Sequence, residues 1–216
     1  MNKILSSVAA AAVVTFGAAA QAATVQIDSF NDNQAPVVAA GGATVSDTVA
    51  TTNAIGGSRT IEVENVSGPF STAGATSSMM GGQFFFSNDA GTQGNAELQY
   101  TGLGGVDFTD SGSNSLFLME VVAIDLGMEV GITVDGVTVS QIVMSQGNIA
   151  FNFADFGGAD LTSVNDLIVS FDSNGIDSVD AIVDFIGAVN PVPLPAGGLL
   201  LLTALGGIAV ARRKSA

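Results

Sequence analysis

Between residues 23 and 190, short hydrophobic runs are separated by clusters of Gly, Ser, Thr, Asn and Asp about every ten residues. Within the runs, hydrophobic and polar positions alternate. In residues 148–154, Ile149, Phe151 and Phe153 fall on one face of an extended chain. A period of two is typical of a half-buried β-strand, because successive side chains of a strand point to opposite faces. Many short strands of this kind predict an all-β sandwich or barrel.

Further runs alternate at residues 60–64, 167–172 and 179–185. Their expected inward-facing residues are Ile61, Val63, Leu167, Val169, Phe171, Val179, Ala181, Val183 and Phe185. Residues 116–124 are apolar on both faces except at Glu120, which predicts a central strand. A buried helix is the alternative, but the β-branched residues and flanking turn residues favour a strand. Asp135-Gly136 stands between two alternating runs and predicts a type I′ hairpin.

Two stretches alternate less clearly. Residues 159–166 predict a loop with a single helical turn, and residues 33–58, rich in Gly, Ala and Thr, predict a mobile loop or an edge strand. No repeat or heptad pattern divides the body, and a chain of about 170 residues buries enough surface for one self-sufficient core. We therefore expect a single antiparallel β-sandwich, jelly-roll-like, over residues 23–190.

The order of elements after Glu97 adds a resemblance. A strand around Tyr100, a Phe-rich strand, the turn Asp160-Leu161-Thr162-Ser163-Val164 and a final Asp-containing strand follow one another. This succession resembles the galactose-binding-like and carbohydrate-binding-module jelly rolls of secreted bacterial proteins. It covers about 90 residues and is a likeness of pattern, without a diagnostic motif. The resemblance implies a jelly-roll sandwich.

Residues 1–22 have the three parts of a secretory signal peptide. Lys3 supplies the positive charge, residues 4–20 are apolar or small, and Ala20-Gln21-Ala22 forms the cleavage site. Cleavage is expected before Ala23. A membrane anchor is the alternative, but the apolar part is short and Ala-rich and no basic flank follows it. The sequence therefore predicts an N-terminal signal peptide helix and export.

Residues 191–216 have the form of a sorting signal. Residues 196–211 carry no charge and precede Arg212, Arg213 and Lys214. As a helix this segment measures about 24 Å, slightly short of a hydrocarbon core of about 30 Å, and its basic end is expected on the cytoplasmic side. The prolines of the preceding residues 192–196 hold the backbone extended. We expect a transmembrane sorting helix over 196–211 and a basic tail over 212–214.

This combination resembles the VPLPA variant of the PEP-CTERM sorting signals of Gram-negative bacteria. The recognition element implied by the resemblance is Val192, Pro193, Leu194, Pro195 and Ala196, followed by the basic residues Arg212 and Arg213. The implied partner is an exosortase-type membrane transpeptidase, which cuts the chain near this motif during a transient stay in the inner membrane. The implied destination is the cell surface or the extracellular matrix. The alternative is an ordinary C-terminal anchor.

The charge distribution excludes several functions. The chain has 20 Asp and Glu against 5 Lys and Arg, and only Arg59 lies between the two terminal signals. Nucleic-acid binding needs several basic side chains on one face, so it is excluded. With no His and no Cys, the chain has no imidazole base, thiolate nucleophile or Ser-His-Asp triad. Because no carboxylate pair stands out in an apolar setting either, we expect a protein that is not an enzyme.

Residues 23–190 contain two candidate binding sites, one for a sugar and one for Ca²⁺. Sugars are bound by an aromatic face with polar side chains beside it, which makes Tyr100 and Arg59 the candidate ligand contacts, together with Asp107 and Asn95. The absence of Trp counts against strong sugar binding. Ca²⁺ takes oxygen ligands, and a Gly-containing turn carries four of them: Asp172, Asn174, Asp177 and Asp180. Ca²⁺ is thus the one cofactor that the sequence suggests.

These observations predict an exported structural or adhesive protein of the cell surface or biofilm matrix, associated with extracellular polysaccharide. The alternative is a carbohydrate-binding module, with or without Ca²⁺, that recognises a matrix polysaccharide.

Overall fold

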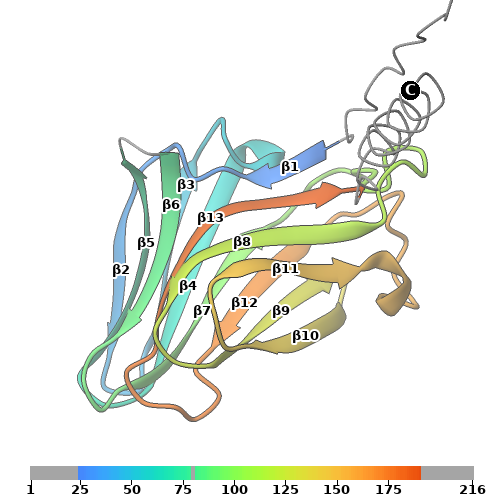
Figure 1. Cartoon of the computed structure of the whole chain (residues 1–216). Coiled ribbons are helices and arrows are strands. Elements are labelled where there is room, and N and C mark those ends of the chain that lie inside the picture. Colours follow the sequence, from blue (N-terminus) through green and yellow to red (C-terminus); the bar gives the residue numbers. More distant parts are fainter. Residues whose placement is uncertain (1–23, 79–80, 191–216) are drawn as a thin grey trace, which may run out of the picture. The chain divides into compact units, whose positions relative to one another are not determined.

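The computed structural model describes residues 24–78 and 81–190 and shows two antiparallel sheets packed face to face (Figure 1). The predicted signal peptide and sorting signal lie outside the described residues. Among the described residues, none belongs to a helix that is long and apolar enough to span a membrane.

The first sheet has seven strands, all paired antiparallel, and is nearer the viewer in Figure 1. In spatial order they are β11 (Gly147–Asn152), β8 (Leu116–Ile124), β13 (Asp180–Val189), β6 (Gly81–Asn88), β5 (Phe70–Ser78) and β2 (Gln34–Ala40). The seventh strand, β1 (Thr24–Asp28), pairs with the C-terminal half of β13.

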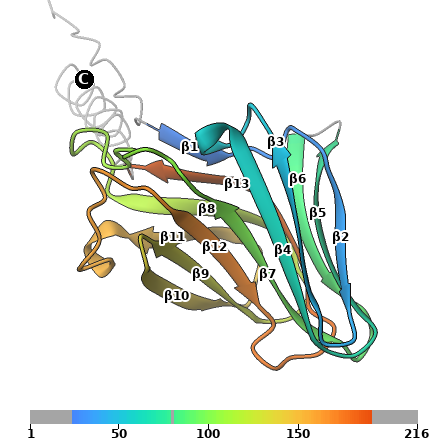
Figure 2. The ribbon, with the colours of Figure 1, turned by 180° about the vertical axis from the view of Figure 1, so that it is seen from behind.

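The second sheet has six strands, also antiparallel, and faces the viewer in Figure 2. Their order is β10 (Val137–Val143), β9 (Met128–Val134), β12 (Leu167–Asp172), β7 (Gln93–Tyr100), β4 (Ser58–Ser67) and β3 (Thr44–Ala50). Two short 3₁₀ helices, η1 (Ile55–Gly57) and η2 (Phe153–Asp155), lie in connections between strands. This architecture confirms the predicted all-β antiparallel sandwich.

Phenylalanine rings from both sheets fill the core. Phe84 of β6 packs against Phe171 of β12 with ring centroids 5.0 Å apart, which joins the two sheets directly. Phe117 of β8 contacts Phe108 and Phe156 edge to face. All five rings are buried, and each contributes about 1.5–3 kcal/mol relative to an exposed ring. The core therefore holds the sheets together without disulfides, since the chain has no Cys.

Several local predictions are confirmed. Residues 116–124 form β8, which lies between β11 and β13 inside its sheet. Asp135 and Gly136 have φ values of 44° and 85°, the positive values that a type I′ turn requires, and they join β9 to β10. Residues 33–58 form β2 and β3, the edge strands of the two sheets, so the edge-strand alternative was correct.

Two local predictions were wrong. Phe185 was expected on the inner face with Val183, but the pairing of β13 with β8 is shifted between these residues. This bulge turns Ile186 into the core and leaves Phe185 half-buried. The helical turn expected in residues 159–166 is absent there; the carboxylate of Asp160 instead accepts a bond from the backbone N–H of Thr162 (3.0 Å), which favours a non-helical turn.

The chain enters and leaves the sandwich at one place. Thr24, the first described residue, pairs with Val189 near the end of β13. The backbone N–H of Ser115, just before β8, also donates to the carbonyl of Val189 (3.1 Å). The two junctions with the predicted terminal signals are therefore neighbours on adjacent strands.

Candidate functional site

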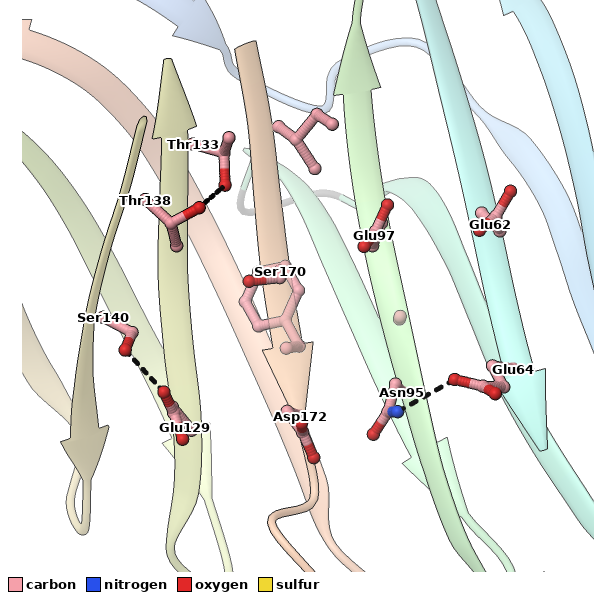
Figure 3. Close-up of a pocket in the computed structure, with 13 residues that line it drawn as sticks. Glu62, Glu64, Asn95, Glu97, Glu129, Thr133, Thr138, Ser140, Ser170 and Asp172 are labelled. Carbon is pink, nitrogen blue, oxygen red and sulfur yellow. Dashed lines mark hydrogen bonds between the residues drawn. The ribbon is translucent and has the colours of Figure 1, made fainter. Parts of the chain in front are cut away.

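A groove crosses the outer face of the six-stranded sheet (Figure 3). It has a volume of about 350 Å³ and is lined by residues of β10, β9, β12, β7 and β4. Four strand spacings of about 4.8 Å give it a length of about 19 Å. Its lining residues are Glu62, Glu64, Asn95, Ala96, Glu97, Glu129, Thr133, Thr138, Ser140, Ile168, Ser170, Phe171 and Asp172.

The pairing register aligns the outward-facing side chains of these strands in three rows. The middle row is Ser140, Gly131, Ser170, Glu97 and Glu62. On one side of it the row is Thr138, Thr133, Ile168, Gln99 and Thr60, and on the other side Ile142, Glu129, Asp172, Asn95 and Glu64. The rows run across the strands because paired residues lie directly opposite one another.

Where β10, β9 and β12 meet, the side chains of the middle row rise little above the sheet, because the residues there are small. A Cβ atom on Gly131 would lie 2.6 Å from Oγ of Ser170 and 3.6 Å from Cβ of Ser140. Larger side chains stand in the rows on either side. Glycine and serine at these positions therefore form the floor of the groove.

Hydrogen bonds between neighbouring strands hold the walls. The hydroxyls of Thr133 and Thr138 share a bond of 2.7 Å, and Nδ2 of Asn95 donates to Oε2 of Glu64 at 3.1 Å (Figure 3). Within the part of the chain that the structure describes, the carboxylate of Glu62 has no hydrogen-bond or ion-pair partner. The groove thus presents both ordered polar walls and an acceptor that is available to a ligand.

The groove is strongly acidic. Its lining includes five carboxylates: Glu62, Glu64, Glu97, Glu129 and Asp172. Glu62 and Glu97 stand directly opposite one another on β4 and β7. Among the described residues Arg59 is the single basic side chain, and it is buried. No basic side chain of the described surface therefore offsets this charge.

Arg59 and Tyr100, the predicted ligand contacts, belong to the core, with no exposed surface. Arg59 donates from Nη1 to Oδ2 of Asp28 and from Nε to Oε1 of Gln34, both at 2.9 Å, and from Nη2 to the carbonyl of Asp32. The hydroxyl of Tyr100 donates to the same Oδ2 of Asp28 at 3.0 Å. Neither side chain reaches the surface, so both have a structural role in place of the predicted contact with a sugar.

Burial controls the ionisation of this cluster. It raises the pKa of Asp28, and the charge of Arg59 with the bonds from Phe30 and Tyr100 offsets only part of that effect. Burial, together with the nearby charge of Asp28, raises the pKa of Tyr100 well above its ordinary value of 10. The folded protein therefore keeps the Tyr100 hydroxyl protonated as a donor to Asp28.

We expect the protein to lose stability above about pH 10 through Tyr100. In the unfolded chain this hydroxyl ionises near pH 10, whereas in the folded chain it stays protonated until a higher pH. Unfolding then releases a proton, so the free energy of unfolding falls by up to about 1.4 kcal/mol per pH unit. Urea unfolding between pH 8 and 11 measures the slope.

The alkaline slope can be assigned to Tyr100 because it is the only Tyr, and residues 23–190 contain no Lys or Cys. A Tyr100→Phe variant should be less stable at neutral pH, since its donation to Asp28 is lost, but its stability should vary little from pH 9 to 11. An equal alkaline slope in this variant would contradict the assignment.

The predicted calcium ligands do not form a cluster. Asp172 lines the groove and accepts a bond from the backbone N–H of Asn174 (2.7 Å). Asp177 accepts a bond from Gln93 (2.8 Å), and the backbone N–H of Asp180 donates to the Asp125 carboxylate. Among the described residues, no three Asp or Glu side chains are close enough together to hold a metal ion.

Of the secondary sugar candidates, Asn95 lies in the groove, whereas Asp107 accepts a bond from the backbone N–H of Thr109 in a turn. Asp172 was predicted as a calcium ligand, and sequence reasoning missed the other groove residues. Their signal was the outward position of Glu62, Glu97 and Ser170 in alternating runs, but this position alone is typical of any solvated strand.

Comparisons with known proteins add little to the geometry. No protein-family model matches the sequence. No curated protein matches it either.

Among solved structures, the family 11 carbohydrate-binding module from Clostridium thermocellum, in complex with a β-1,3-1,4-mixed-linked tetrasaccharide, aligns with a TM-score of 0.41 at 14% identity. The alignment covers 79% of this chain and 98% of that one. The solution structure of CtCBM11 aligns with a TM-score of 0.42 at 12% identity over 82% of this chain and 100% of the other. An exo-β-agarase aligns over 79% of this chain but 25% of its own, with a TM-score of 0.38 at 13% identity. Similarity this weak assigns no ligand.

Proposed function

We propose that the protein binds a polysaccharide chain along the groove of the six-stranded sheet. The observation that carries the proposal is the polar groove of about 19 Å, which crosses five strands and has a floor of small residues where β10, β9 and β12 meet. An elongated, open groove fits a linear polymer better than a compact small molecule, which is bound in an enclosed pocket.

The chemistry of the lining suits sugar hydroxyls. Carboxylates accept hydrogen bonds, while the hydroxyls of Ser170 and Thr133 both donate and accept. Each sugar hydroxyl has the same dual capacity, so it finds partners in either row of the groove. The carboxylates repel uronate or sulfate groups, since no described basic side chain is exposed. The ligand proposed is therefore a neutral polysaccharide.

Hydrolysis is the competing function, because glycosidases also place two carboxylates in a cleft. Glu62 and Glu97 face one another across neighbouring strands. Both are half-exposed among polar side chains, whereas a glycosidase general acid stands in an apolar setting. Binding without cleavage is therefore the function we propose.

A panel of polysaccharides tests the proposal. The full chain is run by native affinity electrophoresis in gels that contain galactomannan, cereal β-glucan, dextran or alginate. We expect retardation by at least one neutral polymer, none by alginate, and no increase in reducing ends after long incubation. Preference for alginate, or failure to bind any neutral polymer, would refute the binding proposal, and a rise in reducing ends would replace it with hydrolysis.

We propose further that the protein acts outside the inner membrane, attached to or released from the cell surface as a matrix component. The support is the sequence of its ends: the apolar N-terminus with its Ala-x-Ala site and the motif of residues 192–196 followed by an apolar segment and Arg212-Arg213. In this proposal an exosortase-type transpeptidase processes the C-terminus. The sandwich then presents its groove to the polysaccharide outside the cell.

The sorting motif makes its own prediction. Replacing Pro193 and Pro195 by Ala removes the fixed extended backbone, so we expect unprocessed protein to accumulate in the inner membrane. Intact mass and membrane fractionation in the native cells measure this. Pro191→Ala, just outside the motif, is the matched control and should be processed normally. Normal processing of the double variant would mean that the motif is not the recognition element.

A further inference from the structure

A row of apolar residues crosses the outer face of the seven-stranded sheet, on the side of the sandwich opposite the groove. Gly74 of β5 pairs with Phe85 of β6, which pairs with Ile182 of β13. Ile182 pairs in turn with Ala123 of β8. At the other end, the Cα atom of Pro36 in β2 lies 3.2 Å from the position of a Cβ atom on Gly74. We call these five residues the apolar strip; its strands are labelled in Figure 1.

The ring of Phe85 lies against the sheet. Its Cζ and Cε1 atoms are 2.8 and 2.9 Å from where a Cβ atom on Gly74 would be, so only glycine leaves room for the ring in this position. Gly74 is buried beneath it, and Phe85 itself remains half-exposed. The result is an aromatic surface that is partly open to solvent and lies against the sheet.

A hollow adjoins this ring. It has a volume of about 360 Å³, and its lining includes Phe85, Ile182 and Ala123 together with Asp125 and Asp180. The backbone N–H of Asp180 donates to Oδ1 of Asp125 at 2.8 Å, which fixes that carboxylate beside the hollow. An apolar surface with hydrogen-bond acceptors at its border is thus already formed.

The apolar strip is one residue wide at Phe85. On one side of Phe85, the next outward row begins at the exposed Val38, which pairs with Thr72. Thr72 pairs with Ser87, which pairs with Asp180. On the other side, Thr76 pairs with Gln83. Apart from Val38, the side chains named on both sides of Phe85 can donate or accept hydrogen bonds.

We propose that the apolar strip is a second polysaccharide-binding site. A chain of linked pyranose rings has C–H faces for an apolar line and hydroxyl edges for the polar rows beside it. A protein partner fits less well: the strip measures about 19 Å by 7 Å, about 130 Å², against about 800 Å² per partner in a standard interface. A second copy is opposed by charge as well, since the described surface carries many acidic side chains and no exposed basic one.

The choice of polysaccharide as ligand rests on the proposed function, while the strip and the groove are separate surfaces on opposite sheets. With both occupied, one protein molecule holds two polysaccharide chains. The protein then cross-links the polymer, which is an activity that the groove alone does not supply.

The test uses the full chain in the same galactomannan, β-glucan and dextran gels. Phe85→Ala and Phe85→Leu remove the flat ring, and Phe85→Leu keeps most of its apolar volume in case the alanine variant is unstable. Phe70→Ala is the matched control, because Phe70 is an exposed Phe at the start of β5, away from the strip. Each variant is made in the native chain and in Gly131→Leu, which fills the groove.

We expect the Gly131→Leu variant to be retarded weakly. Adding Phe85→Leu to this variant should weaken the remaining binding about tenfold, the effect of about 1.4 kcal/mol of lost contact. Phe70→Ala should leave retardation unchanged. The native chain should raise the viscosity of the polysaccharide solution, and each single-site variant should abolish that rise. Equal retardation of Phe85→Leu and its parent in both backgrounds would overturn the second site.

The two proposals fail separately. If Gly131→Leu binds as well as the native chain but Phe85→Leu does not, the groove proposal is wrong and the strip stands. If Phe85→Leu changes nothing and Gly131→Leu abolishes retardation, the strip proposal is wrong and the groove stands. No retardation of any variant in all three gels would overturn both.

Discussion

Arg59→Met should destabilise the protein by about 3–5 kcal/mol, because it leaves a charged partner buried without compensation. Arg59 and Asp28 form an ion pair of 2.9 Å in which neither side chain is exposed. Methionine fills part of the space but donates nothing to Asp28, Gln34 or the carbonyl of Asp32. For a body of this size the melting temperature should fall by about 6–20 °C, which calorimetry measures.

The double variant Arg59→Met with Asp28→Leu is the control. Replacing both members of a buried pair with apolar residues is often neutral or stabilising, so the double variant should recover at least half of the loss. If it is as unstable as Arg59→Met, the unpaired carboxylate is not the main cause; the causes are then the lost packing of the long arginine side chain and the donors of Tyr100 and Phe30 that are left without Asp28.

Gly131→Leu should weaken polysaccharide binding about 100-fold, or about 2.7 kcal/mol, at little expense in stability. A Cβ atom at this position meets one atom closer than 3.0 Å, Oγ of Ser170 at 2.6 Å, and this hydroxyl is free to rotate. Leucine is also a better strand residue than glycine, which weakens strand interiors. Affinity electrophoresis gives the change in binding, and urea unfolding checks the fold.

Ala150→Leu is the matched control for this change. It adds the same side chain at an exposed position of β11 on the opposite sheet, outside both the groove and the apolar strip. Its binding should equal that of the native chain. If Gly131→Leu also binds normally, the polysaccharide does not occupy the groove.

The fold was predictable from local pattern because alternation reports which residues face a core. The same rule contains a signal for Arg59 and Tyr100. Arg59 shares the inward phase of Ile61 in β4, and Tyr100 shares that of Leu98 in β7. An inward arginine is rare and implies a buried acidic partner. That partner, Asp28, is 31 residues away, beyond the reach of local reasoning.

The groove was not predictable for a related reason. Its middle row joins Gly131 to Ser170 and Ser170 to Glu97, residues that are far apart in the sequence. Their alignment depends on the register between strands, which long-range packing sets. A slip of one residue would turn every one of these side chains to the other face. Phe185 shows the same limit, because a single bulge reversed the face that alternation assigned to it.

The position of Val189 determines how the sandwich carries mechanical load. A pull along the chain beyond Val189 acts lengthwise on β13, which is bonded along its whole length to β8 and, in its two halves, to β6 and β1. Such a force acts in shear on many of the backbone hydrogen bonds between β13 and its neighbours at once, so these bonds do not break one after another. Unfolding from this end of the sandwich therefore requires many ladder bonds to break together.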